Sequence, residues 1–160
     1  MLAERIDEVE YKRFIDRGIN ELRFEDEYRS DKYFYHIRDG ETETVLMICK
    51  HCFGLMPVIK LCGNSIYVGS GRSTDMIDRS TLRHCGHYEF CSPVFDLLID
   101  SERVIAVTEI EIVVFDSLGN IETTHRINDI IVDYSIRDSK IFIATFEGHS
   151  LEINIAGGTK

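Results

Sequence analysis

An internal repeat of 37 to 38 residues constrains this chain more than any other feature of its sequence. Segments 96–108 and 134–145 both read as an apolar strand, a polar turn and a second apolar strand, and they align when one turn residue is dropped. Segment 58–70 follows the same pattern. The apolar positions Ile66, Val104 and Ile141 are 38 and then 37 residues apart, and segment 76–78 matches 114–116 at a spacing of 38. Such a period predicts stacked, similar structural units.

The units themselves read as β-structure. Short runs rich in Ile, Val, Tyr, Phe and Thr alternate with turns, only two prolines occur in 160 residues, and Asp39-Gly40 is a strong hairpin turn pair. We therefore expect an all-β, antiparallel fold of roughly a dozen strands in a single domain over 1–160. Strands are expected over 33–37, 44–48, 56–61, 65–69, 94–99, 103–108, 110–116, 130–136, 140–145 and 150–155.

The N-terminal part differs from the repeats. Leu2, Ile6 and Val9 fall on one face of a helix, which predicts a short helix over residues 1 to about 17. We interpret segment 1–30 as a cap for about three and a half β-repeats over 31–155, since a short repeat array must cover its ends.

Each repeat unit resembles the four-stranded blade of β-propellers, whose repeat is about 40 residues long. The chain has no Trp, so the WD dipeptide of one propeller class is absent. The resemblance implies antiparallel, blade-like sheets, arranged as a partial propeller or in a sandwich-like way. Whether the units form an open arc, or whether two chains complete a ring as a homodimer, is left open by the sequence.

One group of residues has the composition of a metal or thiol site. A C-x-x-C spacing is followed about 32 residues later by two histidines, which is compatible with tetrahedral zinc. The alternative is that the cysteines are small buried hydrophobes and that strand neighbours point apart. We favour the alternative, and expect no metal, no cofactor and no catalytic residue. The group consists of Cys49, Cys52, His84, Cys85, His87 and Cys91.

Composition narrows the environment and the partners. The net charge of −10 disfavours direct binding of nucleic acid or of an anionic membrane. No apolar run approaches the roughly 20 residues of a membrane span. The charged N-terminus does not read as a signal peptide, and five cysteines cannot form a complete set of intrachain disulfides. We expect a cytoplasmic location.

The charge is unevenly distributed along the chain. Residues 92–160 contain 12 acidic and 5 basic side chains, a net charge of −7, whereas residues 42–91 carry a net charge of +1. An acidic surface of this kind favours a basic protein partner. The aromatic and acidic segment 24–28 has the residue types of an interface, and is equally compatible with a solvated turn. The predicted partner-binding residues are Glu109, Glu111, Asp133, Glu25, Asp26 and Glu27.

Small size, acidity and the absence of a convincing catalytic motif are together similar to bacterial immunity proteins, which neutralise cognate toxins. That resemblance implies a non-catalytic inhibitor that occludes a basic toxin such as a nuclease. One alternative is a structural interaction subunit, a half-propeller that dimerises or docks in a complex, since an exposed sheet edge favours association. A third hypothesis is a zinc- or thiol-dependent hydrolase that uses the Cys/His group.

Overall fold

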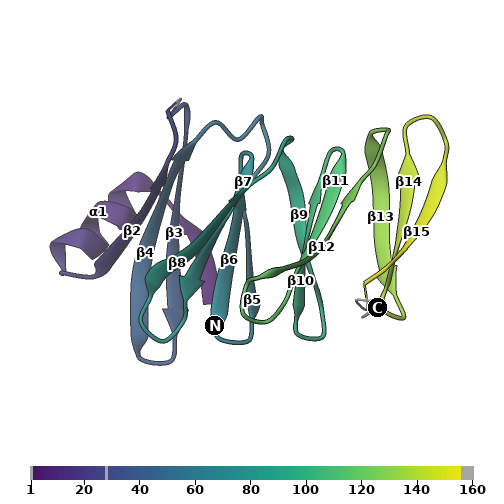
Figure 1. Cartoon of the computed structure of the whole chain (residues 1–160). Coiled ribbons are helices and arrows are strands. Elements are labelled where there is room, and N and C mark those ends of the chain that lie inside the picture. The colour runs from purple at the N-terminus through teal and green to yellow at the C-terminus, as the bar shows by residue number, and fades with distance from the viewer. Residues whose placement is uncertain (1, 28, 156–160) are drawn as a thin grey trace.

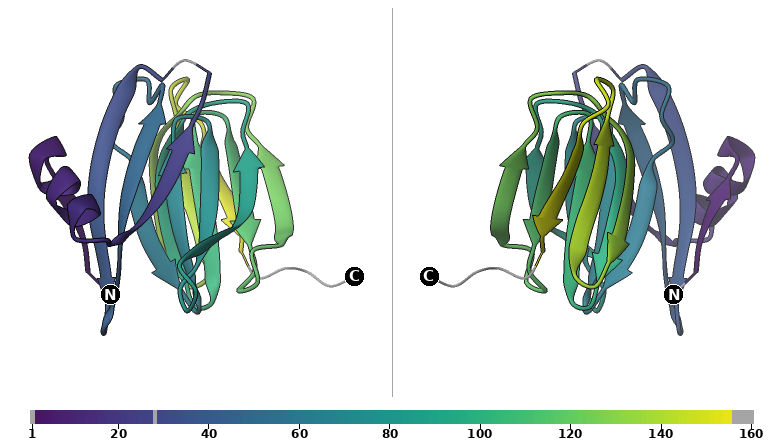
Figure 2. Two further views of the ribbon diagram at one scale, coloured as in Figure 1. Left: turned by 90° about the vertical axis from the view of Figure 1, so that its left-hand side faces the viewer. Right: turned by 90° about the vertical axis from the view of Figure 1, so that its right-hand side faces the viewer.

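The computed structural model of the protein describes residues 2–27 and 29–155. This part of the chain forms four β-sheets, which stack in chain order from one end of the molecule to the other, and one helix against the first sheet (Figure 1). Viewed from either end, the sheets appear as successive layers (Figure 2). The predicted all-β fold of blade-like sheets is confirmed.

Sheets 2, 3 and 4 are consecutive meanders, in which each strand pairs antiparallel with the next one. Sheet 2 contains β5 (Val58–Cys62), β6 (Ser65–Ser70), β7 (Ser73–Asp78) and β8 (Arg83–Glu89). Sheet 3 contains β9 (Val94–Asp100), β10 (Arg103–Thr108), β11 (Glu111–Phe115) and β12 (Ile121–Arg126). Sheet 4 contains β13 (Ile131–Arg137), β14 (Lys140–Thr145) and β15 (Ser150–Asn154).

The sequence repeat corresponds to equivalent positions in these three sheets. Ile66, Val104 and Ile141 are each the second residue of the strand that follows a two-residue turn, and each is fully buried. The aspartates at the end of the next strand are also equivalent. The Asp78 side chain accepts the backbone N–H of Thr81, and that of Asp116 accepts N–H groups of the turn after β11. The repeated Asp therefore ends the strand by satisfying the turn that follows it.

Sheet 1 is assembled differently from the other three. It contains β1 (Leu2–Ile6), β2 (Asn20–Glu25), β3 (Asp31–Asp39) and β4 (Thr42–Lys50), in the spatial order β1-β3-β4-β2. The predicted β3–β4 hairpin is present, but its two turn residues are Gly40 and Glu41, because Asp39 still pairs with Thr42. However, β2 runs parallel to β4, so the prediction of a purely antiparallel fold is wrong for this pair.

The prediction of one helix over residues 1 to 17 is only partly right. Residues 2–6 form β1, which pairs antiparallel with β3 along five residues, and the helix α1 spans Glu8–Asp16. Asp7 separates the two elements, because its side chain accepts the N–H groups of Val9 and Glu10 in a capping box. Tertiary pairing with β3 thus overrides the helical spacing of Leu2 and Ile6.

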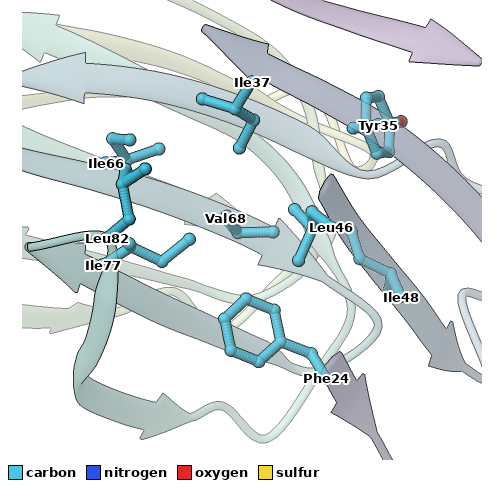
Figure 3. Packing of buried hydrophobic residues seen from close by; sticks show 9 residues of the cluster. All are labelled: Phe24, Tyr35, Ile37, Leu46, Ile48, Ile66, Val68, Ile77 and Leu82. Atoms are coloured by element: carbon cyan, nitrogen blue, oxygen red, sulfur yellow. The ribbon is translucent and has the colours of Figure 1, made fainter. Parts of the chain in front are cut away.

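Three hydrophobic cores lie between successive sheets, and a fourth lies under the helix. The first core fills the space between sheets 1 and 2 (Figure 3). Strands inside the stack contribute to two cores at once: Val104 and Ala106 of β10 face sheet 2, and Ile105 and Val107 face sheet 4. This explains why β10 reads as a continuous apolar run.

Candidate functional site

One end of the stack gathers the turns and loops on which the candidate sites are built. It contains the turns after β6, β10 and β14 and the loops after β4, β8 and β12, which form the upper edge of the molecule in Figure 1. We call this surface the loop face. Equivalent backbone hydrogen bonds join its segments: Phe90 and Val94 donate to Arg72 and Gly71, and 37 residues later Ile127 and Ile131 donate to Ile110 and Glu109.

Over sheets 3 and 4 the loop face combines exposed apolar side chains with carboxylates. Phe146, in the turn after β14, is 76% exposed, and its N–H donates to the carbonyl of Ile130, which is itself exposed. Asp129 accepts the backbone N–H of Glu147. Contiguous backbone contacts therefore bring the acidic and apolar residues of two sheets onto one surface. The residues of this patch are Glu109, Ile110, Asp129, Ile130, Phe146 and Glu147.

The acidic residues predicted in the C-terminal half have different positions. Glu109 lies on the loop face, and Asp133 is exposed on β13. Glu111 is only 3% exposed, and its carboxylate accepts the backbone N–H of Cys91 at 2.8 Å. Glu111 therefore does not belong to the exposed acidic surface on which it was predicted, because β11 is packed on both sides and all five of its residues are buried.

The predicted residues Glu25, Asp26 and Glu27 all line a groove of about 720 Å³ at the loop face, between sheets 1 and 2. Glu25 is paired with Arg29 at 3.1 Å. The Asp26 side chain accepts the backbone N–H groups of Arg29 and His51, so it holds the loop in place. Phe24, grouped with these residues as an interface candidate, is instead buried in the first core, and Tyr28 lies outside the described residues.

Beside this groove lies a buried charged cluster that the sequence did not indicate. Lys50, at the end of β4, and Asp75, on β7, have side chains only 6% and 4% exposed. The Lys50 Nζ donates to the Oδ2 of Asp75 and to the Oγ of Ser73, both at 2.6 Å, and lies 5.7 Å from the centroid of the Phe24 ring. Neither position stands out in the sequence, because Lys50 is the last residue of β4 and Asp75 lies in a largely polar strand.

Two histidines complete this cluster on its solvent side. The Oδ1 of Asp75 lies 2.6 Å from the Nδ1 of His87 and 3.3 Å from the Nε2 of His84. Both rings are about half exposed, with side-chain exposures of 40% and 45%. They line a second pocket of about 250 Å³ together with Lys50 and the β2 segment from Leu22 to Glu25.

A β-bulge places the two histidines on the same side of β8. Residues three apart on a regular strand point to opposite faces. In β8, His84 pairs with Ile77 and Gly86 with Met76, so the register shifts and Cys85 is left unpaired. The extra residue rotates the strand and brings both imidazoles to Asp75. Strand alternation, which would place His84 and His87 on opposite faces of β8, is interrupted at this bulge.

The structure separates the cysteines of the predicted Cys/His group from the histidines. Among the described residues, the group able to surround a metal ion is Asp75, His84 and His87, and it contains no cysteine. Cys49 and Cys52 are buried, as the alternative interpretation expects. Burial raises the pKa of Cys52 to about 11, so this thiol stays protonated at neutral pH. Partial burial also raises the pKa of the Cys85 thiol, although the residue as a whole is exposed.

The fold and the stacked sheets define the class of this protein: it has the architecture of part of a β-propeller. No protein-family model matches the chain, and the comparison with curated proteins found no match. None of the helices among residues 2–27 and 29–155 has the length and apolar character needed to cross a membrane.

Two solved structures illustrate the likeness. The β-propeller domain of Cps50 (Swd1) from Myceliophteria thermophila is similar with a TM-score of 0.53 and 11% identity, over 78% of this chain and 38% of that one. A structure of BBS1N in complex with ARL6DN is similar with a TM-score of 0.55 and 13% identity, over 82% of this chain and 42% of that one. The chain thus spans about two-fifths of the length of these propeller chains. At this identity the likeness shows the fold alone.

Proposed function

We propose that this protein is a non-catalytic binding module that docks a basic protein partner on the loop face of sheets 3 and 4. The observation that carries the proposal is the patch formed by Glu109, Ile110, Asp129, Ile130, Phe146 and Glu147, where exposed apolar groups are surrounded by carboxylates. Protein interfaces commonly consist of an apolar, aromatic centre with a charged rim.

The sign of the charge favours a basic partner. Residues 92–160, which build sheets 3 and 4, carry a net charge of −7, so their field attracts cations and repels anions. Propeller folds host many functions, so the fold itself is no argument for a particular partner. One of the similar structures is, by its description, a complex with another protein. This supports the use of a propeller-like fold for protein binding in general.

We further propose that binding is inhibitory: the acidic patch occupies lysine and arginine side chains with which a toxin such as a nuclease grips its substrate. Occlusion of this kind requires a 1:1 complex and no chemistry from the inhibitor. It is also consistent with electrostatic steering, which speeds association between oppositely charged proteins at low ionic strength.

The test combines charge reversal with matched controls at the opposite end of the same sheet. The variants Glu109→Lys/Glu147→Lys and Phe146→Ser alter the patch, whereas Glu102→Lys and Leu118→Ser change an exposed charge and an exposed apolar group away from it. Each protein is used to capture partners from the source organism at low and high salt, and the captured proteins are identified by mass spectrometry.

We expect the wild type and both controls to retain the same basic protein at 1:1 stoichiometry, in a salt-sensitive manner. Its affinity is expected to fall at least about tenfold in each patch variant, because Phe146 has the character of an interface anchor. Equal capture by the patch variants, or an acidic partner, would overturn the docking proposal. A basic partner whose nuclease or other toxic activity is unchanged by a stoichiometric amount of this chain would overturn the inhibitory part.

A further inference from the structure

The geometry points to a divalent transition-metal site formed by Asp75, His84 and His87, which the proposed binding function neither requires nor uses. One ligand atom from each of these three residues lies within 4.8 Å of the other two. Two imidazoles and one carboxylate suit zinc and neighbouring first-row metals. We take Zn²⁺ as the metal to be tested.

One of the distances among the three ligand atoms already matches what zinc requires, and a second is shorter. With metal–ligand bonds of about 2.0–2.2 Å, tetrahedral ligand atoms lie ~3.4 Å apart. The Oδ1 of Asp75 and the Nε2 of His84 are 3.3 Å apart, which meets this spacing without rearrangement. The Nδ1 of His87 lies at 2.6 Å from the same oxygen, as a hydrogen-bond partner does. Its half-exposed ring has room to withdraw by less than 1 Å when a metal replaces the shared proton.

Hydrogen bonds to Asp75 and a bulge in β8 hold the three ligands in place. Asp75 is buried, and its second oxygen is held by Lys50, which is in turn held by Ser73. Outer hydrogen bonds of this kind fix the orientation of a ligating carboxylate. The β-bulge at Cys85 brings both histidines to the same side of β8, because without it the two imidazoles would point to opposite faces of the strand. Bulges often re-aim side chains at functional sites.

All three ligands line the 250 Å³ pocket, whose wall on sheet 1 includes Glu25, so the pocket leaves space for a fourth ligand. Three protein ligands and one open position are the arrangement of zinc sites that exchange a ligand, as opposed to closed structural sites. The positive charge of Lys50 next to the carboxylate opposes a second cation, so we expect an affinity in the micromolar range.

The experiment is a Zn²⁺ titration of the whole chain in competition with a chromophoric chelator, followed by Co²⁺ substitution and absorption spectroscopy. The test variants are His84→Gln and His87→Gln. His149→Gln serves as the histidine control, because its ring is exposed on the loop face, and Cys91→Ser removes an exposed thiol outside the bulge. Circular dichroism verifies that every variant is folded.

We expect one Zn²⁺ per wild-type chain and an affinity at least about 100-fold lower in each test variant, since loss of outer-shell partners alone costs 10–100-fold. Both controls keep the wild-type affinity, and the Co²⁺ spectrum lacks thiolate charge-transfer bands. Absence of binding in the micromolar range, equal binding by the test variants, or thiolate bands would each overturn the site. The variant Glu109→Lys/Glu147→Lys binds zinc normally, which keeps this test separate from that of the docking surface.

Discussion

At the scale of single residues, the most unusual feature is the Lys50–Asp75 ion pair. Both side chains are nearly inaccessible to solvent, and they lie beside the apolar core between sheets 1 and 2. Burying two charges is costly, and their attraction offsets the cost only when further hydrogen bonds satisfy the remaining polar atoms. Ser73 and the two histidines provide those bonds. The pair therefore links sheet 1 to sheet 2 at a defined register.

Removing one partner of this pair is predicted to be far more harmful than removing both. Asp75→Asn leaves the Lys50 ammonium buried without its counter-charge, and we expect it to lower the free energy of unfolding by about 3–5 kcal/mol. The double variant Lys50→Met/Asp75→Leu restores most of this loss, since apolar residues of similar volume fit the same space. Urea denaturation of the three proteins measures the effect. A double variant no more stable than Asp75→Asn would contradict this account of the pair.

At the scale of elements, the two-residue turns after β5, β9 and β13 occupy the same place in the three sheets, although only the third turn also has a positive φ at its second residue, Ser139. The first turn residue has a positive φ in all three: 56° at Gly63, 57° at Ser101 and 50° at Asp138. Glycine adopts this conformation without steric strain, whereas a side chain costs free energy there. The same backbone position is thus occupied by one well-suited residue and one strained residue in neighbouring sheets.

Exchanging these residues is predicted to have opposite effects. Ser101→Gly is expected to raise the free energy of unfolding by about 0.5–1 kcal/mol, and Gly63→Ser to lower it by a similar amount, because strain and chain entropy partly cancel. No atom lies within 4 Å of a Cβ built on Gly63, so the change tests the backbone conformation alone. Thermal or urea unfolding measures both variants. Shifts of the same sign would show that turn conformation does not determine these effects.

Elements also show where sequence-based prediction succeeds. The strands of sheets 2 to 4 follow from local signals, namely apolar runs and tight turns, and the repeat confirms them from one unit to the next. Sheet 1 does not follow from such signals, because β1 and β2 flank α1 in sequence and reach opposite edges of the sheet. The histidine site was missed for a related reason: the bulge at Cys85 has no sequence signature, and alternation places His84 and His87 on opposite faces. Asp75 could not be recognised as a site residue from the sequence, and only its burial in the structure identifies it.

At the scale of the whole molecule, the two outer faces of the stack are covered or polar. The helix α1 covers the outer face of sheet 1, where Tyr11 packs against Phe34 and Val45 (Figure 2). The register of sheet 4 places Ile141 and Ile143 in the third core and puts Ser135, Phe142 and Glu152 on the opposite face. Within the described residues, neither outer face presents an extended apolar surface.

This arrangement predicts that the chain is monomeric, in contrast to the homodimer that a half-propeller suggested. Light scattering at tens of micromolar is expected to give the mass of one chain. Tyr11→Ser/Phe14→Ser removes the apolar contacts of α1 and is expected to cause self-association, since Phe34 and Val45 then become accessible. A homodimer of the wild-type protein, unaffected by salt, would instead favour ring completion by two copies.

The hydrogen bonds that join successive sheets have a consequence for how such a chain can grow. The turn carbonyls of Gly71 and Arg72 receive the loop after β8 in the same way that those of Glu109 and Ile110 receive the loop after β12. The start of sheet 3 thus donates to the sheet before it, and its central turn accepts from the segment that leads into the sheet after it. Duplication of residues 73–110 in tandem would extend the stack by one sheet without a new type of joint. In this respect the fold is a linear array of repeating units, each 38 residues long.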